Sequence, residues 1–370
     1  MKNFFKNLFF LLKNDFDLIV FSEGIQYQKI YIEIIKILST KRIRILYVTL
    51  DKSEKLNLKN VTILTFGKSV FRSILYHMLK GKILLTTTPD IGNNEIPISK
   101  KIKDYFYIFH SAASTHKLYN KNAFDNFNVI MANGDYQIDE LKKIEVFNNS
   151  KKKNYLRTGY IYFDYLAKNK FINPSNLNPK NILFAPSWNK NKNNLTSAFG
   201  KSLIGNLLKS NMRVIFRPHP EQIKRSNKTI SLIFNSFKNN KNFLLDTNES
   251  NLNSLAYSKL LITDNSAIAI EFNLIFQKPV IYIDYKDKIN NQDYKFLDIK
   301  NFELEIKKKF GYVIKCGNND FEDINDIINK AEIDFAKKKY LLNEFLNKNF
   351  YNYGSVAEVA SQQIIDHLSE

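Results

Sequence analysis

The sequence predicts an α/β protein with two Rossmann-like, doubly wound domains, each a parallel sheet flanked by helices. Three observations predict it. Short apolar segments alternate with segments of helical period along most of the 370 residues. The apolar segments are continuous, which is typical of strands buried on both faces of a parallel sheet. The alternation stops once, at a stretch rich in Asn and Pro, and then begins again.

The first domain is expected to span residues 1–170 and to form the acceptor side. Helical patterns at Ile25–Leu38 and Ser69–Leu79 lie between several of its strands. The segments that are typical of strands are Asp17–Phe21, Arg42–Leu50, Val61–Phe66, Lys82–Thr87, Tyr105–Phe109 and Asn128–Asn133.

The stretch Asn169–Asn181 is the expected linker, and the second domain, residues 171–370, is expected to bind the nucleotide donor. Helices such as Ser355–Leu368 end the chain, and for the last of them packing back on the first domain is one option. The predicted strands are Ile182–Pro186, Arg213–Pro218, Asn242–Asp246, Lys259–Thr263, Pro279–Asp284 and Gly311–Cys316. Ligands of such sheets bind outside the carboxyl ends of the strands, so we expect the site in the cleft between the domains.

The composition gives a net charge of +19, from 55 Lys and Arg against 36 Asp and Glu. Such a surface favours anionic partners, whether nucleic acid, acidic lipid or a polyphosphate chain. Compositional drift toward Lys and Asn is an equal explanation. The single cysteine, Cys316, rules out an internal disulfide and fits a cytoplasmic protein.

The first residues, MKNFFKNLFFLLKNDFDLIVF, resemble a signal peptide, but charges interrupt the apolar patch and no small-residue cleavage site follows. No apolar run reaches the roughly 18–20 residues of a membrane span. Apolar residues lie here at helical spacing: Phe4, Phe5, Leu8, Leu11 and Leu12. Two interpretations stay open. One is a basic amphipathic helix at the inner face of a membrane, and the other is a first helix that packs on the core.

The stretch VIFRPHPEQ places Arg217 and His219 two residues apart, with the histidine between Pro218 and Pro220. Residues two apart in an extended segment point to the same side, and proline stiffens that segment. Both side chains donate hydrogen bonds to phosphate oxygens. We therefore expect them to bind a diphosphate.

Two further stretches follow predicted strands. In YIFHSAASTHK, His110 comes directly after a strand, where a histidine can take a proton from a hydroxyl, and His116 is a weaker candidate for the same cleft. In LFAPSWNK, Ser187 and Trp188 are candidates to line the cleft, although a tryptophan that only packs a loop explains the pattern equally well.

The stretch LLITDNSAIAIEF predicts a strand, a turn and a helix. Asp264, Asn265 and Ser266 are residue types that cap helix N-termini, where free N–H groups favour an anion. Glu271 lies one to two turns further on and is expected to accept hydrogen bonds from ribose hydroxyls.

Several classes are disfavoured. The chain has only 11 glycines and no Walker-type loop, which argues against an ATPase. It has no G-x-S-x-G elbow and no His, Cys and Asp cluster at metal-ligand spacing. We expect no cofactor, and dependence on a divalent metal stays open. A nucleic-acid-binding protein is disfavoured because Lys is spread along the chain rather than gathered in a basic stripe.

The elements IFHS, APSW, FRPHP and TDNSAIAIE together resemble, in the same order, the CDP-glycerol glycerophosphotransferases of teichoic-acid and capsule synthesis. The resemblance covers roughly residues 105–284. It implies a GT-B fold, a cell-envelope transferase, a CDP-activated alditol donor and an anionic polymer or lipid-linked acceptor. It also implies that His110 is the catalytic base. The residues implied at the nucleotide are Arg217, His219, Asp264, Asn265, Ser266 and Glu271.

The mechanism expected from this resemblance is attack of an acceptor hydroxyl on the phosphorus that bears the alditol. His110 takes the proton, and CMP leaves while Arg217, His219 and the helix N-terminus stabilise its charge.

Departures from the family pattern leave the transferred group open. They are Ser111 for Gly, Ser187 for Thr, Asn189 for Arg, Ala267 for Ser and Glu271 for Asp. A ribitol phosphate, or a conventional GT-B glycosyltransferase with a nucleotide-sugar donor, therefore stays an alternative.

Overall fold

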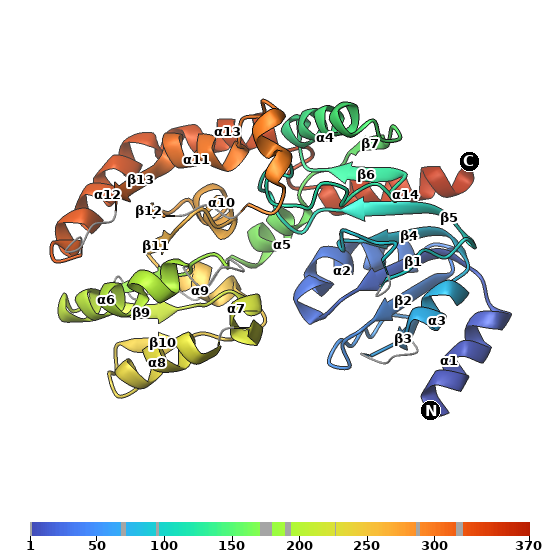
Figure 1. The fold of residues 1–370 in the computed structure, drawn as a ribbon, viewed down its shortest axis with the longest axis horizontal. Coiled ribbons are helices and arrows are strands. Elements are labelled where there is room, and N and C mark those ends of the chain that lie inside the picture. Colours follow the sequence, from blue (N-terminus) through green and yellow to red (C-terminus); the bar gives the residue numbers. More distant parts are fainter. Residues whose placement is uncertain are drawn as a thin grey trace. The chain divides into compact units, whose positions relative to one another are not determined.

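The computed structural model describes residues 2–67, 72–93, 96–170, 180–188, 194–225, 227–285, 289–315 and 321–370. It contains two sheets flanked by helices, which confirms the predicted α/β class (Figure 1). Most of the predicted linker and Cys316 lie outside the described residues.

The first sheet has seven strands in the order β3-β2-β1-β4-β5-β6-β7, all paired in parallel. Leu18 of the central strand β1 is the register partner of Ile45 on one side and of Ile83 on the other. The strands are β1 Phe16–Ser22, β2 Ile45–Thr49, β3 Val61–Thr65, β4 Gly81–Thr86, β5 Ile102–Ile108, β6 Val129–Ala132 and β7 Asn154–Arg157.

The second sheet has six parallel strands in the order β10-β9-β8-β11-β12-β13. The central strands β8 and β11 are buried along their whole length, as continuous apolar segments require. The strands are β8 Asn181–Phe184, β9 Arg213–Phe216, β10 Phe243–Leu245, β11 Leu260–Thr263, β12 Val280–Asp284 and β13 Gly311–Lys315.

Among the described residues, helices connect β1 to β2, β3 to β4 and β6 to β7 in the first sheet, and they connect every pair of consecutive strands in the second. The α-helices are α1 Lys2–Lys13, α2 Ile25–Ser39, α3 Arg72–Met78, α4 Asp135–Asn148, α5 Ile161–Asn169, α6 Leu195–Lys209, α7 Pro220–Arg225, α8 Asn227–Phe237, α9 Leu252–Tyr257, α10 Ile268–Leu274, α11 Phe302–Phe310, α12 Ile324–Lys338, α13 Leu342–Asn349 and α14 Val356–Ser369. Two short 3₁₀ helices are η2 Gln292–Phe296 and η3 Lys339–Leu341.

The chain divides into two compact units, which are not continuous in sequence. Unit 1 comprises Met1–Tyr165, Asn290–Ile299 and Asn349–Glu370, and unit 2 comprises Leu166–Ile289 and Lys300–Lys348. Within unit 1, Asp164 accepts hydrogen bonds from the backbone N–H groups of Gly354 (2.8 Å) and Val356 (2.7 Å). These bonds fix the start of α14, which packs on α2. The division at residues 170/171 stays a sequence-based prediction.

Helix α1 has two apolar faces. Leu11 is buried, and Phe4 and Leu8 pack against the core of unit 1. This confirms that the helix packs on the core. The other face leaves Phe5, Phe9 and Leu12 exposed, by 61, 59 and 60 %. Because Phe5, Phe9 and Leu12 lie at helical spacing, they form one apolar stripe on the surface.

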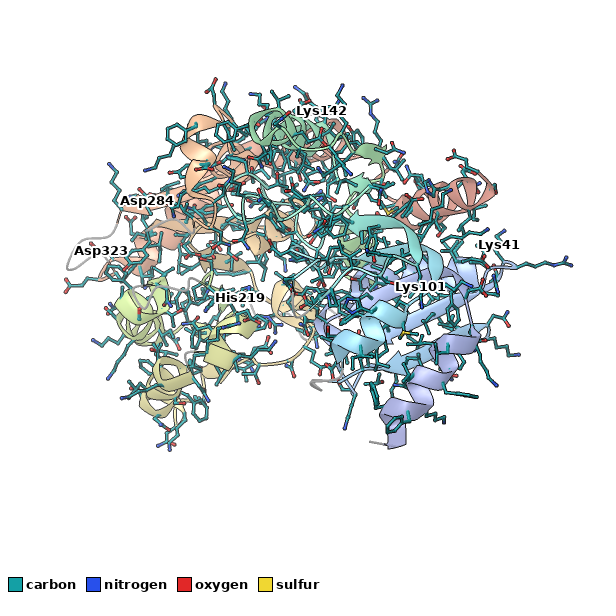
Figure 2. The ribbon with its side chains drawn as sticks, turned by 45° about the vertical axis from the view of Figure 1, so that its right-hand side comes forward. Lys41, Lys101, Lys142, His219, Asp284 and Asp323 are labelled. Atoms are coloured by element: carbon teal, nitrogen blue, oxygen red, sulfur yellow. The ribbon has the colours of Figure 1, made fainter. Side chains whose placement is uncertain are left out.

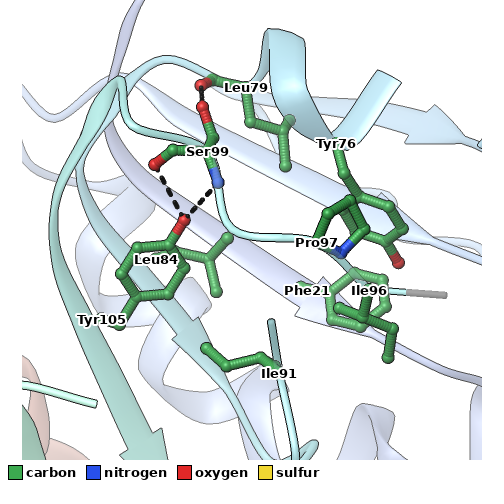
Figure 3. A pocket seen from close by; sticks show the side chains of 9 residues that line it. All are labelled: Phe21, Tyr76, Leu79, Leu84, Ile91, Ile96, Pro97, Ser99 and Tyr105. Atoms are coloured by element: carbon green, nitrogen blue, oxygen red, sulfur yellow. Dashed lines mark hydrogen bonds between the residues drawn. The ribbon is translucent and has the colours of Figure 1, made fainter. Parts of the chain in front are cut away.

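One cavity of about 10 Å³ lies in the core of unit 1, and Figure 3 shows the side chains around it. Its lining is mostly apolar, and the Tyr105 hydroxyl accepts from the Ser99 backbone N–H (2.8 Å) and donates to the Ser99 carbonyl (3.1 Å). Such a volume holds at most one water molecule, so this cavity is a small packing gap rather than a substrate site.

Candidate functional site

The carboxyl ends of the strands in unit 2 bring together three of the predicted motifs. Ser187 and Trp188 follow β8, Arg217 and His219 follow β9, and Asp264 follows β11. Because β8 lies between β9 and β11 and all three are parallel, these segments share one edge of the sheet.

Asp264 joins two of these motifs. Its carboxylate accepts from the Ser187 backbone N–H (2.8 Å) and from the Ser187 hydroxyl (2.7 Å). Burial raises the pKa of Asp264, and the hydrogen bonds from Ser187 oppose that rise. Ser187 and Asp264 are 77 residues apart, so this bond ties the loop after β8 to the loop after β11.

The prediction that Asp264, Asn265 or Ser266 caps the following helix is wrong. Helix α10 has Ala267 at its N-cap position, and no side chain caps it. Asp264 is held by Ser187 instead, and the side-chain oxygen Oδ1 of Asn265 accepts a hydrogen bond from Lys307. The first amides of the turn are also used locally, since Ala269 N donates to Ser266 O at 3.1 Å.

Arg217 is buried and carries an ion pair that sequence reasoning missed. Its guanidinium lies 2.6 Å from the Asp246 carboxylate and donates to the Asn248 carbonyl at 2.7 Å. Burial opposes ionisation of Asp246, but the Ser254 hydroxyl and the charge of Arg217 outweigh burial and lower its pKa. The order of the strands was the signal that could have revealed this ion pair, because Asp246 follows β10, which pairs with β9.

His219 is exposed and has a defined orientation (Figure 2). Its Nδ1 accepts the backbone N–H of Glu221 at 3.1 Å, so the neutral imidazole carries its proton on Nε2. The ring stacks near Trp188, with centroids 6.4 Å apart, and Arg225 lies 5.7 Å from the Trp188 ring centroid. In this tautomer Nε2–H is the hydrogen-bond donor of the ring.

Glu271 is 7 % exposed on α10, and its carboxylate accepts a hydrogen bond from the Asn251 side chain at 3.4 Å. Sequence reasoning had not singled out Asn251. The burial agrees with a position facing inward from the helix, while contact with a ribose stays a prediction.

His110 lies in unit 1, two residues after the end of β5. Its ring meets Tyr27 of α2 edge to face, with centroids 5.1 Å apart, and its backbone carbonyl accepts from the Tyr160 hydroxyl at 3.0 Å. The next two carbonyls are also anchored, by Asn133 at 3.0 Å and by Tyr136 at 2.6 Å. The half-buried imidazole is therefore carried by a loop whose backbone is fixed on several sides.

His116 is not on a ligand-facing surface, contrary to the prediction. It is 1 % exposed, and its Nδ1 lies 3.6 Å from the Glu140 carboxylate. The other oxygen of Glu140 accepts from the backbone and hydroxyl of Thr115, at 2.6 and 2.8 Å. The pair therefore anchors the loop that follows His110 inside unit 1.

A segment from the second half of the chain completes this loop. The Asn291 side chain, 5 % exposed, donates to the His116 carbonyl at 2.9 Å. The Asn290 backbone N–H donates to Lys117 O at 3.0 Å, and its side chain to Leu118 O at 2.6 Å. The stretch Asn290–Ile299 thus belongs to unit 1, although its flanking residues in sequence belong to unit 2.

Two absences hold for the described residues. They contain no cluster of three or more His, Cys, Asp or Glu side chains that is able to hold a metal ion. Within the same residues, every helix is too short or too polar to cross a membrane.

Comparison with solved structures defines the fold. A variant of the wall teichoic acid polymerase TagF is similar over 95 % of this chain and 89 % of its own, with 13 % identity and a TM-score of 0.62. S. aureus MnaA bound to UDP is similar over 96 % of both chains, with 10 % identity and a TM-score of 0.62. The Methanocaldococcus jannaschii UDP-GlcNAc 2-epimerase covers 95 % of this chain and 100 % of its own, with 14 % identity and a TM-score of 0.58. The fold is therefore GT-B.

The family follows from sequence. No curated protein matches the chain, but the family model described as CDP-Glycerol:Poly(glycerophosphate) glycerophosphotransferase matches residues 99–344. The chain belongs to this family and is a transferase of the type that uses CDP-glycerol. The resemblance carried by the sequence motifs is confirmed.

Proposed function

We propose that the protein transfers glycerol phosphate from CDP-glycerol to a hydroxyl group of a growing surface polymer or of its lipid-linked acceptor. The observation that carries the proposal is that the family match includes all four motifs, each at the carboxyl end of a parallel strand. Such ends are where α/β sheets bind ligands.

In the proposed reaction, the acceptor oxygen forms a bond to the phosphorus that bears glycerol. The bond from that phosphorus to the bridging oxygen breaks, and CMP leaves with the electron pair. His110 accepts the proton of the hydroxyl, so the atoms and charges of the transfer balance. Unit 1 supplies this base, and unit 2 supplies the donor site.

His219 is proposed to donate from Nε2 to a phosphate oxygen of the donor. The support is its tautomer, because Nδ1 already accepts the Glu221 N–H. In this tautomer the ring has no acceptor left for a hydroxyl proton, so His219 suits charge stabilisation rather than general-base work. Arg217 is proposed to support phosphate binding mainly by holding the loop after β9 in place, because its guanidinium is paired with Asp246.

Identification of the released nucleotide tests the proposed reaction. The purified protein is incubated with membrane acceptor and, separately, with CDP-glycerol, CDP-ribitol, UDP-sugars or GDP-sugars. We expect CMP from CDP-glycerol and no nucleoside diphosphate from the sugar donors. Release of UDP or GDP would show glycosyl transfer and contradict the proposal, and CMP from CDP-ribitol alone would change the alditol.

We also propose that the protein binds an anionic membrane surface through α1. The support is the exposed stripe of Phe5, Phe9 and Leu12 beside the exposed Lys6 and Lys13. An apolar stripe flanked by lysines combines burial of apolar area with attraction to acidic lipids.

The double variant Phe5→Ser, Phe9→Ser tests this surface. Each phenylalanine that enters the interface contributes on the order of 1.5–3 kcal/mol, so we expect at least a tenfold loss of binding to phosphatidylglycerol vesicles. The measurement is co-sedimentation at constant salt. Leu232→Ser is the control, because Leu232 is 61 % exposed on α8 of unit 2. Equal binding by the double variant and the control would exclude α1 as the membrane contact.

A further inference from the structure

Lys307 of α11 is a buried cation at the same edge of the unit 2 sheet. It is 7 % exposed, and its ammonium donates to Asn265 Oδ1 at 3.1 Å and to Asp284 Oδ1 at 3.3 Å. Asn265 follows β11, and Asp284 ends the neighbouring strand β12. A lysine is rarely buried without a partner, so its position among the donor motifs needs an explanation.

Arg217 and Lys307, which are both buried in unit 2, are held differently. Arg217 pairs at 2.6 Å with Asp246, both side chains being at most 10 % exposed, and Asn248 holds it further. Lys307 pairs at 3.3 Å with Asp284, whose side chain is 53 % exposed. A half-exposed carboxylate is already well solvated, so little free energy is lost when a ligand replaces it as the partner of the lysine. Lys307 is therefore the cation whose partner is more easily exchanged for a phosphate.

Lys307 also fixes the orientation of the Asn265 amide. Because the ammonium donates to Oδ1, the other polar group of this side chain is Nδ2, which is a hydrogen-bond donor. The preceding residue, Asp264, is tied to Ser187, so the backbone at this point is also anchored. The ammonium of Lys307 and the N–H₂ group of the amide whose oxygen it contacts are both hydrogen-bond donors, and such a pair suits an anion.

We propose that Lys307 binds a phosphate group of the nucleoside diphosphate donor, directly through Nζ and through the Asn265 amide that it orients. The inference rests on the proposed function, which supplies the donor. It gives Lys307 the role of a cation that binds phosphate, which the sequence motif had predicted for Arg217.

The test is binding of CDP-glycerol and CDP to the full chain by titration calorimetry, with Lys307→Met, Lys307→Arg and Asn265→Ala. Lys308→Met is the matched control, since Lys308 is the next residue of α11 and is exposed. A charge-assisted hydrogen bond gives an expected weakening of about tenfold to a hundredfold for Lys307→Met. We expect a smaller loss for Asn265→Ala, partial recovery in Lys307→Arg and no change for Lys308→Met.

A second readout separates phosphate binding from a structural effect. Cytidine lacks phosphate, so its inhibition constant against turnover is expected to be the same in Lys307→Met and wild type. Equal weakening of cytidine and CDP would show a structural role, and unchanged CDP binding in both Lys307→Met and Asn265→Ala would overturn the inference. Failure of the wild-type protein to bind CDP-glycerol would instead refute the proposed function.

Discussion

Replacing His110 with Ala is expected to lower the rate of CMP release from CDP-glycerol by about 10²–10⁴-fold, the usual contribution of a positioned general base. The imidazole lies against Tyr27, and its backbone carbonyl is anchored by Tyr160. Removing the ring leaves that backbone bond in place, so the loop is expected to keep its conformation. The loss should therefore appear in kcat, with the KM for CDP-glycerol changed little.

The control for this experiment is His77→Ala. His77 is exposed and lies on α3. Among the described residues, the contact of its Nδ1 is with the carbonyl of Ser73, one helical turn earlier, at 2.8 Å. It belongs to the same unit as His110, which makes the two substitutions comparable. A His110→Ala protein with near-wild-type turnover would remove this residue from the mechanism, whatever the donor.

Strand-end motifs were the part of the site that the sequence predicted well. Apolar strands are continuous in the sequence, and polar residues that directly follow them must lie at the carboxyl edge of a parallel sheet. Pattern alone therefore placed Ser187, His219 and Asp264 at one edge. It missed β7 because Asn154–Arg157 is an edge strand with only two apolar residues, Tyr155 and Leu156.

The partners of these residues were not predictable in the same way. Ser187 and Asp264 meet because β8 and β11 are neighbours in the sheet, although 77 residues separate the two side chains. Lys307 stands in the run Lys307–Lys309, which is typical of a solvated surface. Only the packing of α11, with Ile306 and Phe310 buried, shows that the first of the three lysines points inward.

Contacts between distant segments also changed the roles of two predicted residues. His116 was expected at a ligand-facing surface, but Glu140 of α4 and Asn291 enclose it. Arg217 was expected to bind the donor, but its guanidinium is paired with Asp246, which follows the neighbouring strand. A sequence motif identifies the residue types at a strand end. Whether their charge is available to a ligand depends on the charged side chains that follow the neighbouring strand.

The buried pair of Arg217 and Asp246 gives the largest expected effect on stability. Replacing Asp246 with Ala leaves a buried guanidinium without its carboxylate, which typically costs about 3–5 kcal/mol of the free energy of unfolding. Urea unfolding of unit 2 at pH 7 measures this loss. Asp326→Ala is the control, because the pair Asp326–Lys330 is about 60 % exposed, with side-chain fractions of 59 and 60 %. Exposed pairs contribute roughly 0–1 kcal/mol.

The pH dependence of this pair has a defined sign. The folded-state pKa of Asp246 lies below its ordinary value of 3.8, so the pair stabilises unit 2 fully above that value. The stabilisation is lost as the pH falls through the folded-state pKa, where the carboxylate takes up a proton. We therefore expect the stability difference between wild type and Asp246→Ala to shrink below pH 3.8. A difference that stays constant from pH 7 to pH 3 would mean that packing, and not the ionised carboxylate, is what the substitution removes.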